Sequence, residues 1–133
     1  MDDNSAAPVV QVVELDHIVI VTTDVERQLA WWTGLLGLEG DRVDAWRRGE
    51  VPFPSVRVTD GCIVDLQRGE RTGVNVDHVC LRVQPGGVQA VVDSGRFTIV
   101  DGGPDTIRYG ARGLATSVYV TDPDGNVVEL REY

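Results

Sequence analysis

Two halves of this chain carry closely similar sequences, and its two histidines occupy matching positions in them. Leu15-Asp16-His17-Ile18-Val19 in the first half corresponds to Val76-Asp77-His78-Val79-Cys80 in the second. Further along, the sequence that starts at Ser55 recurs from Ser117 onwards. An internal repeat constrains the fold more strongly than any local pattern, because each copy must form the same unit of structure. We therefore expect one architecture, built twice.

Each copy closes with an acidic, strand-like segment, around Asp65 in the first and Glu129 in the second. The repeat thus supplies two imidazoles and two carboxylates, which are typical ligands of a divalent metal ion. An apolar residue or a cysteine lies two positions from each of them, on the same strand face, which indicates an enclosed space. An unpaired carboxylate there would be costly. The alternative without a metal is a polar core that pairs His17 with Glu129 and His78 with Asp65.

At 133 residues the chain fits a single domain. The repeat divides this domain into module one, residues 12–67, a charged and glycine-rich linker, residues 68–75, and module two, residues 76–133. A module of about sixty residues is too small to bury its apolar face alone. The modules must therefore pack on each other or on those of a second chain, and we expect a homodimer.

Charge and composition exclude several classes of partner. The net charge of −9 and the pI near 4.5 argue against nucleic acid, which requires a basic surface. No apolar run approaches the roughly twenty residues that cross a bilayer. The acidic segment 1–5 lacks the pattern of a secretory signal, and Cys62 and Cys80 have neither metal nor redox spacing. We expect a cytoplasmic protein with no membrane contact.

The order of predicted elements is βαβββ in each module. In module one, apolar residues at helical spacing begin at Val25 and end before Gly37, after a Thr23-to-Glu26 capping-box pattern. The predicted strands of this module are 15–22, 42–46, 55–59 and 62–67. In module two we predict a helix at 88–94 and a glycine-rich loop at 102–115. The strands are 76–83, 97–101, 116–121 and 126–132. Residues 1–11 are predicted to be a frayed leader.

Four segments resemble the vicinal oxygen chelate superfamily, which includes glyoxalase I, fosfomycin-resistance enzymes, bleomycin-resistance proteins, methylmalonyl-CoA epimerase and extradiol dioxygenases. They are the opening Leu15–Val19, the aromatic pair and helix end Trp31–Leu38, the Asp77-His78 strand, and Asp122-Pro123-Asp124-Gly125 with its strand Asn126–Leu130. The resemblance covers residues 12–133. It implies an α+β fold in which two βαβββ modules form a cupped mixed sheet, but no single activity, because the superfamily performs several chemistries on one scaffold.

In metalloenzymes of this superfamily, ligands come from the first and last strands of each unit. The resemblance therefore implies four ligands, namely His17, Asp65, His78 and Glu129. Asp65 stands where Glu or Gln is more usual, so Gln67, two residues along on the same strand face, is an alternative ligand or a substrate contact. Zn²⁺, Ni²⁺, Mn²⁺ and Fe²⁺ all accept such ligands, and the sequence leaves the ion open.

Strand alternation gives further residues that face the predicted cup. Arg57 and Tyr119 occupy equivalent positions in the repeat, and both are predicted to orient a substrate. Arg57 would bind an anionic or carbonyl oxygen of the substrate, and Tyr119 would donate a hydrogen bond or stack on it. Arg82 shares a strand face with His78, and Arg112 in the glycine-rich loop is placed to cover the cup. Exposure to solvent or to an interface remains the alternative for these residues.

Three hypotheses of function follow from the resemblance. The first is a metal-dependent lyase, isomerase or epimerase acting on a small oxygen-rich substrate, with Glu129 or Asp65 moving a proton. The second is a metal-free drug-binding protein similar to bleomycin-resistance proteins, in which the net charge of −9 attracts a cationic, planar drug. The third is an Fe(II) extradiol dioxygenase that uses two histidines and one glutamate. A fourth ligand at Asp65 argues against this third hypothesis.

Overall fold

The computed structural model describes residues 7–35, 37–74, 76–121 and 125–133. Module one contributes β1 (Val12–Thr22), α1 (Val25–Ala30), a π-helical turn η1 (Trp31–Leu35), β2 (Glu39–Asp41), α2 (Val43–Arg47), β3 (Ser55–Thr59) and β4 (Cys62–Arg68). Module two contributes β5 (Val76–Val83), α3 (Gly87–Ser94), β6 (Ile99–Gly110), β7 (Gly113–Thr121) and β8 (Val127–Glu132). Within these described ranges, no helix is long and apolar enough to cross a bilayer.

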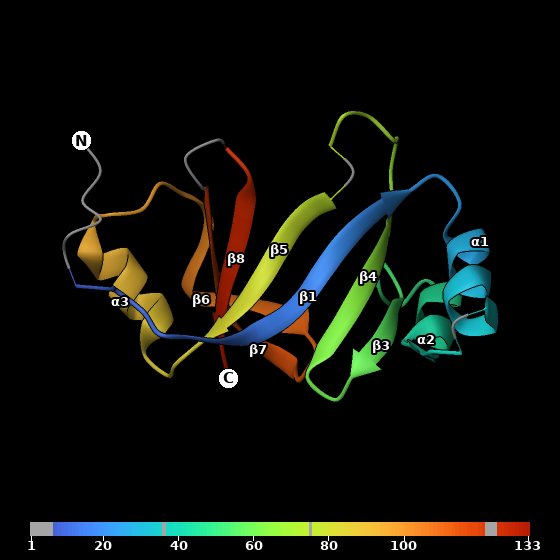
Figure 1. The fold of residues 1–133 in the computed structure, drawn as a ribbon, viewed down its shortest axis with the longest axis horizontal. Helices are drawn as coiled ribbons and strands as arrows, with labels where there is room; N and C mark the ends of the chain where they lie inside the picture. The colour runs from blue at the N-terminus through green and yellow to red at the C-terminus, as the bar shows by residue number, and fades with distance from the viewer. Residues whose placement is uncertain (1–6, 36, 75, 122–124) are drawn as a thin grey trace.

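The eight strands form one mixed sheet in the order β2-β3-β4-β1-β5-β8-β7-β6 (Figure 1). Each half of the sheet has the same arrangement, because β1-β4-β3-β2 corresponds to β5-β8-β7-β6. β1 pairs with β4 in parallel and with β5 antiparallel, so the β1–β5 ladder joins the two halves. The prediction of an α+β fold with a mixed sheet is confirmed.

One face of each half-sheet is apolar and is covered by its own helix. In module one, Val25 and Leu29 of α1 pack against Val56, Val64 and Leu66 of β3 and β4. In module two, buried valines and a leucine of β5, α3, β7 and β8 form the matching core: Val83, Val88, Val91, Val118, Val120 and Leu130. The helices α1 and α3 lie toward opposite ends of the molecule (Figure 1). Alternate residues of the same strands point to the other face, which carries the polar groups.

The prediction of a strand at 42–46 is wrong, because the chain turns into α2 directly after the short strand β2. Arg42 adopts a left-handed backbone with φ of 59°, which ends the extended conformation. Val43 and Trp46 then lie three residues apart on one helix face and pack against the α1 core. Tertiary packing thus overrides the strand propensity of this segment.

The prediction of a glycine-rich loop at 102–115 is also wrong. β6 extends through Gly110 and forms a long hairpin with β7. Gly102 has a positive φ of 81°, and a Cβ atom there would lie 2.5 Å from the carbonyl oxygen of Ser117. Glycine is therefore required by the close approach of two strands rather than by a loop. The hairpin carries several residues of the cavity described below.

Two smaller predictions need correction at the start of the chain. The side chain that caps α1 belongs to Asp24, which accepts a hydrogen bond from the backbone N–H of Arg27, and not to Thr23. Residues 1–6 lie outside the described residues, but the end of the predicted leader does not fray. Val9 and Val10 pack against the core of module two.

Candidate metal centre

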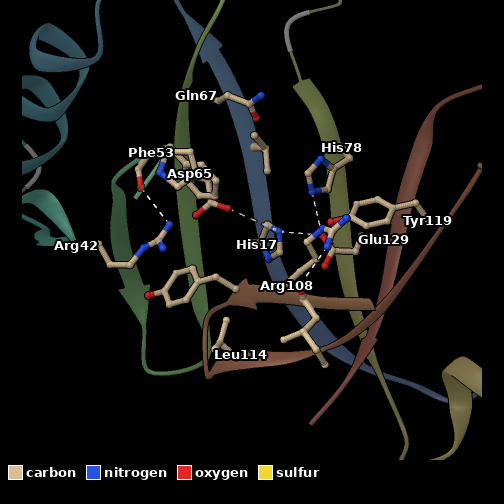
Figure 2. Close-up of a pocket in the computed structure, with 14 residues that line it drawn as sticks. His17, Arg42, Phe53, Asp65, Gln67, His78, Arg108, Leu114, Tyr119 and Glu129 are labelled. Atoms are coloured by element: carbon tan, nitrogen blue, oxygen red, sulfur yellow. Dashed lines mark hydrogen bonds and ion pairs between the residues drawn. The ribbon is translucent and has the colours of Figure 1, made fainter. Parts of the chain in front are cut away.

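The polar face of the sheet encloses a cavity of about 420 Å³. The four proposed ligands His17, Asp65, His78 and Glu129 all line it, and Figure 2 shows their side chains directed toward one another. They come from β1, β4, β5 and β8, the four central strands of the sheet. The repeat therefore brings one histidine and one carboxylate from each module into a shared space.

The two imidazoles are held in the same way by the aspartate that precedes each of them. Nδ1 of His17 contacts Asp16 at 2.6 Å, and Nδ1 of His78 contacts Asp77 at 2.7 Å. Both aspartates lie where the register of the β1–β5 ladder shifts by one residue. Such irregularities re-aim side chains, and this lets neighbouring residues of a strand contact each other. The Asp-His pairs of the repeat thus fix both ring orientations.

With Nδ1 engaged, both Nε2 atoms face the same oxygen of Glu129. Oε1 of Glu129 lies 3.2 Å from Nε2 of His17 and 3.0 Å from Nε2 of His78. One potential ligand atom from each of these three residues lies within 4.8 Å of the other two. Two histidines and one carboxylate therefore form the tightest cluster in the cavity.

Asp65 lies beside this cluster rather than within it. Its Oδ2 is 3.7 Å from Nε2 of His17, and its Oδ1 accepts a 2.5 Å hydrogen bond from the hydroxyl of Ser55. Asp65 is almost fully buried, and burial raises the pKa of its carboxyl group despite the nearby charge of His17. Of the two acidic residues in the cavity, Asp65 is thus the one that holds a proton more readily.

Glu129 differs from Asp65 because both of its oxygens are engaged. Oε2 accepts hydrogen bonds from the hydroxyl of Ser117 at 2.7 Å and from Nη1 of Arg131 at 3.0 Å. Burial acts to raise the pKa of Glu129, but hydrogen bonds to His17 and His78 hold it well below its usual range. The residue is therefore a stable anion.

Arg131 extends this network beneath the cluster. Its side chain is fully buried, and its Nη2 donates to the backbone oxygens of Arg108 and Gly113 in the β6–β7 hairpin. Tyr133 donates its hydroxyl proton to Asp16, the partner of His17. Arg131 of β8 thus ties Glu129 to the β6–β7 hairpin, and Tyr133, which follows β8, holds Asp16.

The donor set fits a divalent cation. Because the carboxylates of Asp16 and Asp77 only accept hydrogen bonds, each Nδ1 carries a proton, and the Nε2 of a neutral imidazole then presents a lone pair to Glu129. Lone pairs that converge on a carboxylate oxygen repel it unless protons or a cation lie between them. Ligand atoms about 2.1 Å from one ion and at right angles to each other would be about 3 Å apart. The distances to Oε1 of 3.2 and 3.0 Å match this spacing.

Without a cation, protons must take its place. Burial acts to lower the pKa of His17, but its hydrogen bonds to Asp16 and Glu129 raise it to about 9. The pKa of His78 is also raised, because its hydrogen bonds to Glu129 and Asp77 outweigh burial. Both pKa shifts favour protonated imidazoles around the carboxylate of Glu129 when no cation is bound.

Three arginines that were predicted to contact a substrate do not line this cavity. Arg57 forms an ion pair with Asp41 at 2.7 Å. Arg82 and Arg112 both pair with Glu14, at 2.9 and 2.7 Å. Each guanidinium pairs with an acidic residue, Asp41 on the edge strand β2 or Glu14 near the start of β1, and strand alternation alone does not reveal these pairs.

Tyr119 and Gln67 do line the cavity, and the ring of Tyr119 meets that of His78 edge to face at 5.4 Å.

The predicted equivalence of Arg57 and Tyr119 is wrong, however. In the ladders Ser55 lies opposite Asp65, whereas Tyr119 lies opposite Glu129. More residues separate β7 from β8 than β3 from β4, which shifts the second hairpin relative to the first. The connection includes Asp122, Pro123 and Asp124, which lie outside the described residues.

The cavity wall formed by Arg42, Phe53 and the β6–β7 hairpin could not be predicted by strand alternation within the repeat. The hairpin contributes Ile107, Arg108, Tyr109 and Leu114. The β-branched and aromatic residues between positions 106 and 109 were a signal for a strand, which the neighbouring glycines concealed. Arg42 gave no comparable signal, because the segment was predicted to be a strand.

Comparison with known proteins gives similarity at the level of structure. No family model matches the chain, and no curated protein matches it by sequence. The Mn(II)-bound glyoxalase from Novosphingobium aromaticivorans matches 92% of this chain at a TM-score of 0.71 and 18% identity, and the chain spans 40% of that protein. Methylmalonyl-CoA epimerase from Mycobacterium tuberculosis matches 96% of the chain at a TM-score of 0.61 and 16% identity, with 92% of the epimerase covered.

A 2,3-dioxygenase from Pseudomonas sp. KL28 matches 94% of the chain at a TM-score of 0.66 and 15% identity, and 42% of that enzyme is covered. The glyoxalase, the epimerase and the dioxygenase are all members of the vicinal oxygen chelate superfamily. At these identities the likeness concerns the fold and not the activity. This chain has the fold of the vicinal oxygen chelate superfamily.

Proposed function

We propose that this protein is a divalent-metal-dependent enzyme that moves a proton within a small, oxygen-rich substrate. The observation that supports this most strongly is the convergence of two imidazole Nε2 atoms on Oε1 of Glu129, at 3.2 and 3.0 Å. Asp16 and Asp77 orient the two rings from behind, as outer-shell carboxylates do in metal sites. His17, His78 and Glu129 would hold the ion.

A divalent ion at this position would act as a Lewis acid on neighbouring oxygen atoms of a substrate, and so acidify an adjacent C–H group. The residues around it must then supply a base. Asp65 fits this role better than Glu129, because its raised pKa makes it the stronger base and one of its oxygens is not held by Ser55.

In this reaction Asp65 takes the proton from the carbon next to the carbonyl group, and the electron pair of the C–H bond moves toward the carbonyl oxygen. When the protonated Asp65 delivers the proton to the neighbouring carbon, and the hydroxyl proton of the substrate moves to the former carbonyl oxygen, the reaction is an isomerisation. An epimerisation instead requires that a second acid deliver a proton to the opposite face of the same carbon while Asp65 keeps the first. Tyr119 borders the same space as a neutral hydroxyl donor, because burial raises the pKa of its phenol.

Metal binding and proton transfer can be tested separately. Atomic emission after dialysis against Mn²⁺, Zn²⁺, Ni²⁺ or Fe²⁺ measures the ion content of the parent protein and of the His78→Ala variant. We expect about one ion per chain in the parent and little in the variant. Full occupancy in His78→Ala would remove the proposed site.

The proton-transfer step is tested by deuterium incorporation from D₂O into α-hydroxyketones and α-keto acids, followed by NMR. Asp65→Asn should keep the ion and lose about 10²–10⁴-fold in exchange rate, the usual contribution of a general base. Asp44→Asn, at an exposed position on α2, is the matched control. Equal exchange rates in Asp65→Asn and the parent would contradict the role of Asp65.

An Fe(II) extradiol dioxygenase is the second candidate, because the tight cluster contains two histidines and one carboxylate, with Asp65 outside it. That ligand set is the facial triad of non-haem iron oxygenases. Oxygen uptake with catechol, after anaerobic loading with Fe²⁺, distinguishes this activity from proton exchange.

A protein that binds no ion but binds a cationic drug of the bleomycin class would instead be a binding protein.

A further inference from the structure

Arg42 lines the cavity and forms no ion pair with a carboxylate of the described residues. Its Nη2 donates to the backbone oxygen of Phe53, and its Nε is buried without a hydrogen-bond partner. The chain has 21 acidic residues against 12 basic ones, so a carboxylate partner would be easy to supply. The guanidinium of Arg42, which faces the cavity and has no carboxylate partner among the described residues, is therefore available to a ligand.

The other arginines around the cavity differ from Arg42 in this respect. Arg57 pairs with Asp41, and Arg131 pairs with Glu129. Arg108, which also lines the cavity, lies 3.5 Å from Asp101. Within the part of the chain that the structure describes, Arg42 is thus the cavity-lining arginine that forms no ion pair with a carboxylate.

Aromatic rings hold the guanidinium of Arg42 in place. Its central carbon lies 3.8 Å from the centre of the Tyr109 ring and 5.0 Å from that of Phe53. Tyr109 is itself fixed by a hydrogen bond from its hydroxyl to Asp41. Contacts of this kind engage the face of a guanidinium and leave N–H groups at its edge, which suit an oxyanion.

The position of Arg42 relates this charge to the proposed metal centre. Figure 2 shows Arg42 and Phe53 on the Asp65 side of His17, and Tyr119 on the opposite side. The positive charge of Arg42 acts on Asp65 and favours its ionised form, without a direct ion pair. Arg42, Asp65 and the two histidines line one cavity, so a ligand that spans Arg42 and the histidines would share this space with Asp65. The side chains around such a ligand would include four apolar or aromatic residues that line the cavity, namely Phe53, Ile107, Tyr109 and Leu114.

We propose that the substrate is an organic anion with a planar, apolar body, whose carboxylate binds Arg42 while its other oxygen atoms face His17, His78 and Glu129. The contact between the carboxylate and Arg42 is inferred from Arg42 alone. The contact of the other oxygen atoms with the metal centre rests on the proposed function. A protein of net charge −9 repels anions in general, so an uncommitted guanidinium at the wall would select those that fit this cavity.

The backbone of Arg42 supplies a variant suited to the test. Its φ of 59° is the one positive value among the described residues other than glycine. Asparagine tolerates this conformation better than arginine, so Arg42→Asn removes the guanidinium without backbone strain. Arg48→Asn is the matched control, because Arg48 lies at the other end of α2 and pairs with Glu50 at the surface. Arg42→Gln serves as a second variant should the first fail to fold.

The experiment compares benzoate with benzamide, which has the same size but no charge, by isothermal titration of the metal-free protein. We expect the parent and Arg48→Asn to bind benzoate about tenfold or more tightly than benzamide, and Arg42→Asn to bind the two equally. An absent preference in the parent, or an unchanged preference in Arg42→Asn, would overturn the proposal.

A Mn²⁺ titration of the same three proteins keeps this result separate from the proposed function. Arg42→Asn should bind Mn²⁺ as the parent does, because Arg42 contacts none of the three ligands. Failure of the parent to bind any divalent ion would contradict the metal-dependent enzyme, whereas the benzoate result would still report on Arg42.

Discussion

The imidazole rings of His17 and His78 lie 5.5 Å apart and meet at an angle of 82°, although they come from different modules. The β1–β5 ladder brings them together, because His17 lies opposite Cys80 and Val19 lies opposite His78. The site therefore lies where the two copies of the repeat meet. This arrangement leads to the following expectations.

Replacing Asp77 by Asn should weaken metal binding without unfolding the protein. Asp77 contacts Nδ1 of His78 at 2.7 Å. Its side chain is half-exposed, so burial of Asp77 contributes little to the stability of the fold. Loss of such an outer carboxylate typically lowers metal affinity by about 10- to 100-fold. Isothermal titration with Mn²⁺ measures the effect, and the exposed Asp44→Asn is the control. An affinity equal to that of the parent would show that Asp77 does not support a ligand.

The stability of the metal-free protein should fall as the pH rises from 6.5 to about 9. The folded-state pKa of His17 is raised from 6.5 to about 9, so folding takes up a proton in this range. Its contribution is fully present below pH 6.5 and is lost as the pH passes through the folded value, with a slope of about 1.4 kcal/mol per pH unit. The raised pKa of His78 acts in the same direction.

Urea unfolding in the presence of EDTA, at several pH values, measures this dependence. His17→Gln should show a shallower slope than the parent, because one of the two groups is gone. A parent stability that rises between pH 6.5 and 9 would contradict the protonated state described for the metal-free site.

Removing the hydroxyl of Ser117 should destabilise the fold even in the absence of metal. Ser117 is fully buried, donates to Oε2 of Glu129 and accepts from Arg131. Ser117→Ala leaves two buried charged groups short of a partner, and we expect a loss of about 1–3 kcal/mol. Ser55→Ala, which removes the hydrogen bond to Asp65, tests the other module in the same way. Denaturant unfolding gives both values, and unchanged midpoints would indicate that the carboxylates are solvated.

Replacing Arg131 by Met should have a larger effect than any surface substitution. The guanidinium is fully buried and balances Glu129, so its removal leaves a buried anion and costs about 3–5 kcal/mol. Arg112→Met, which removes a surface ion pair with Glu14, is the matched control and should change little. Thermal unfolding followed by circular dichroism separates the two. Similar melting temperatures for both variants would contradict the role assigned to Arg131.

The residues that could be predicted from the sequence are those whose positions follow from the repeat and from strand alternation. Asp65 and Glu129 lie in strands with regular alternation, and the register shifts at Asp16 and Asp77 come just before His17 and His78, so the common face of the four residues could be inferred from the sequence. The serines that hold the two carboxylates belong to the repeated segment as well, two residues before Arg57 in the first copy. Ser55 and Ser117 would have been found by asking which donors satisfy a buried acid.

Arg42 could not be predicted, because its place depends on a single backbone reversal between β2 and α2. Arg108 and Tyr109 were assigned to a loop because glycines nearby were interpreted as chain breaks, whereas Gly102 serves the close contact of two strands. In both cases contacts between distant segments, and not local preference, decide the conformation.

The β1–β5 ladder makes the proposed divalent-ion site depend on assembly of the two halves. A chain cut between Arg68 and Val76 would yield one fragment with His17 and another with His78 and Glu129. Neither fragment alone holds enough ligands for tight chelation, so affinity would return only when the fragments recombine. Ion binding and fragment association are then linked equilibria, because each raises the apparent affinity of the other. Complementation between the cut halves could therefore be titrated with metal.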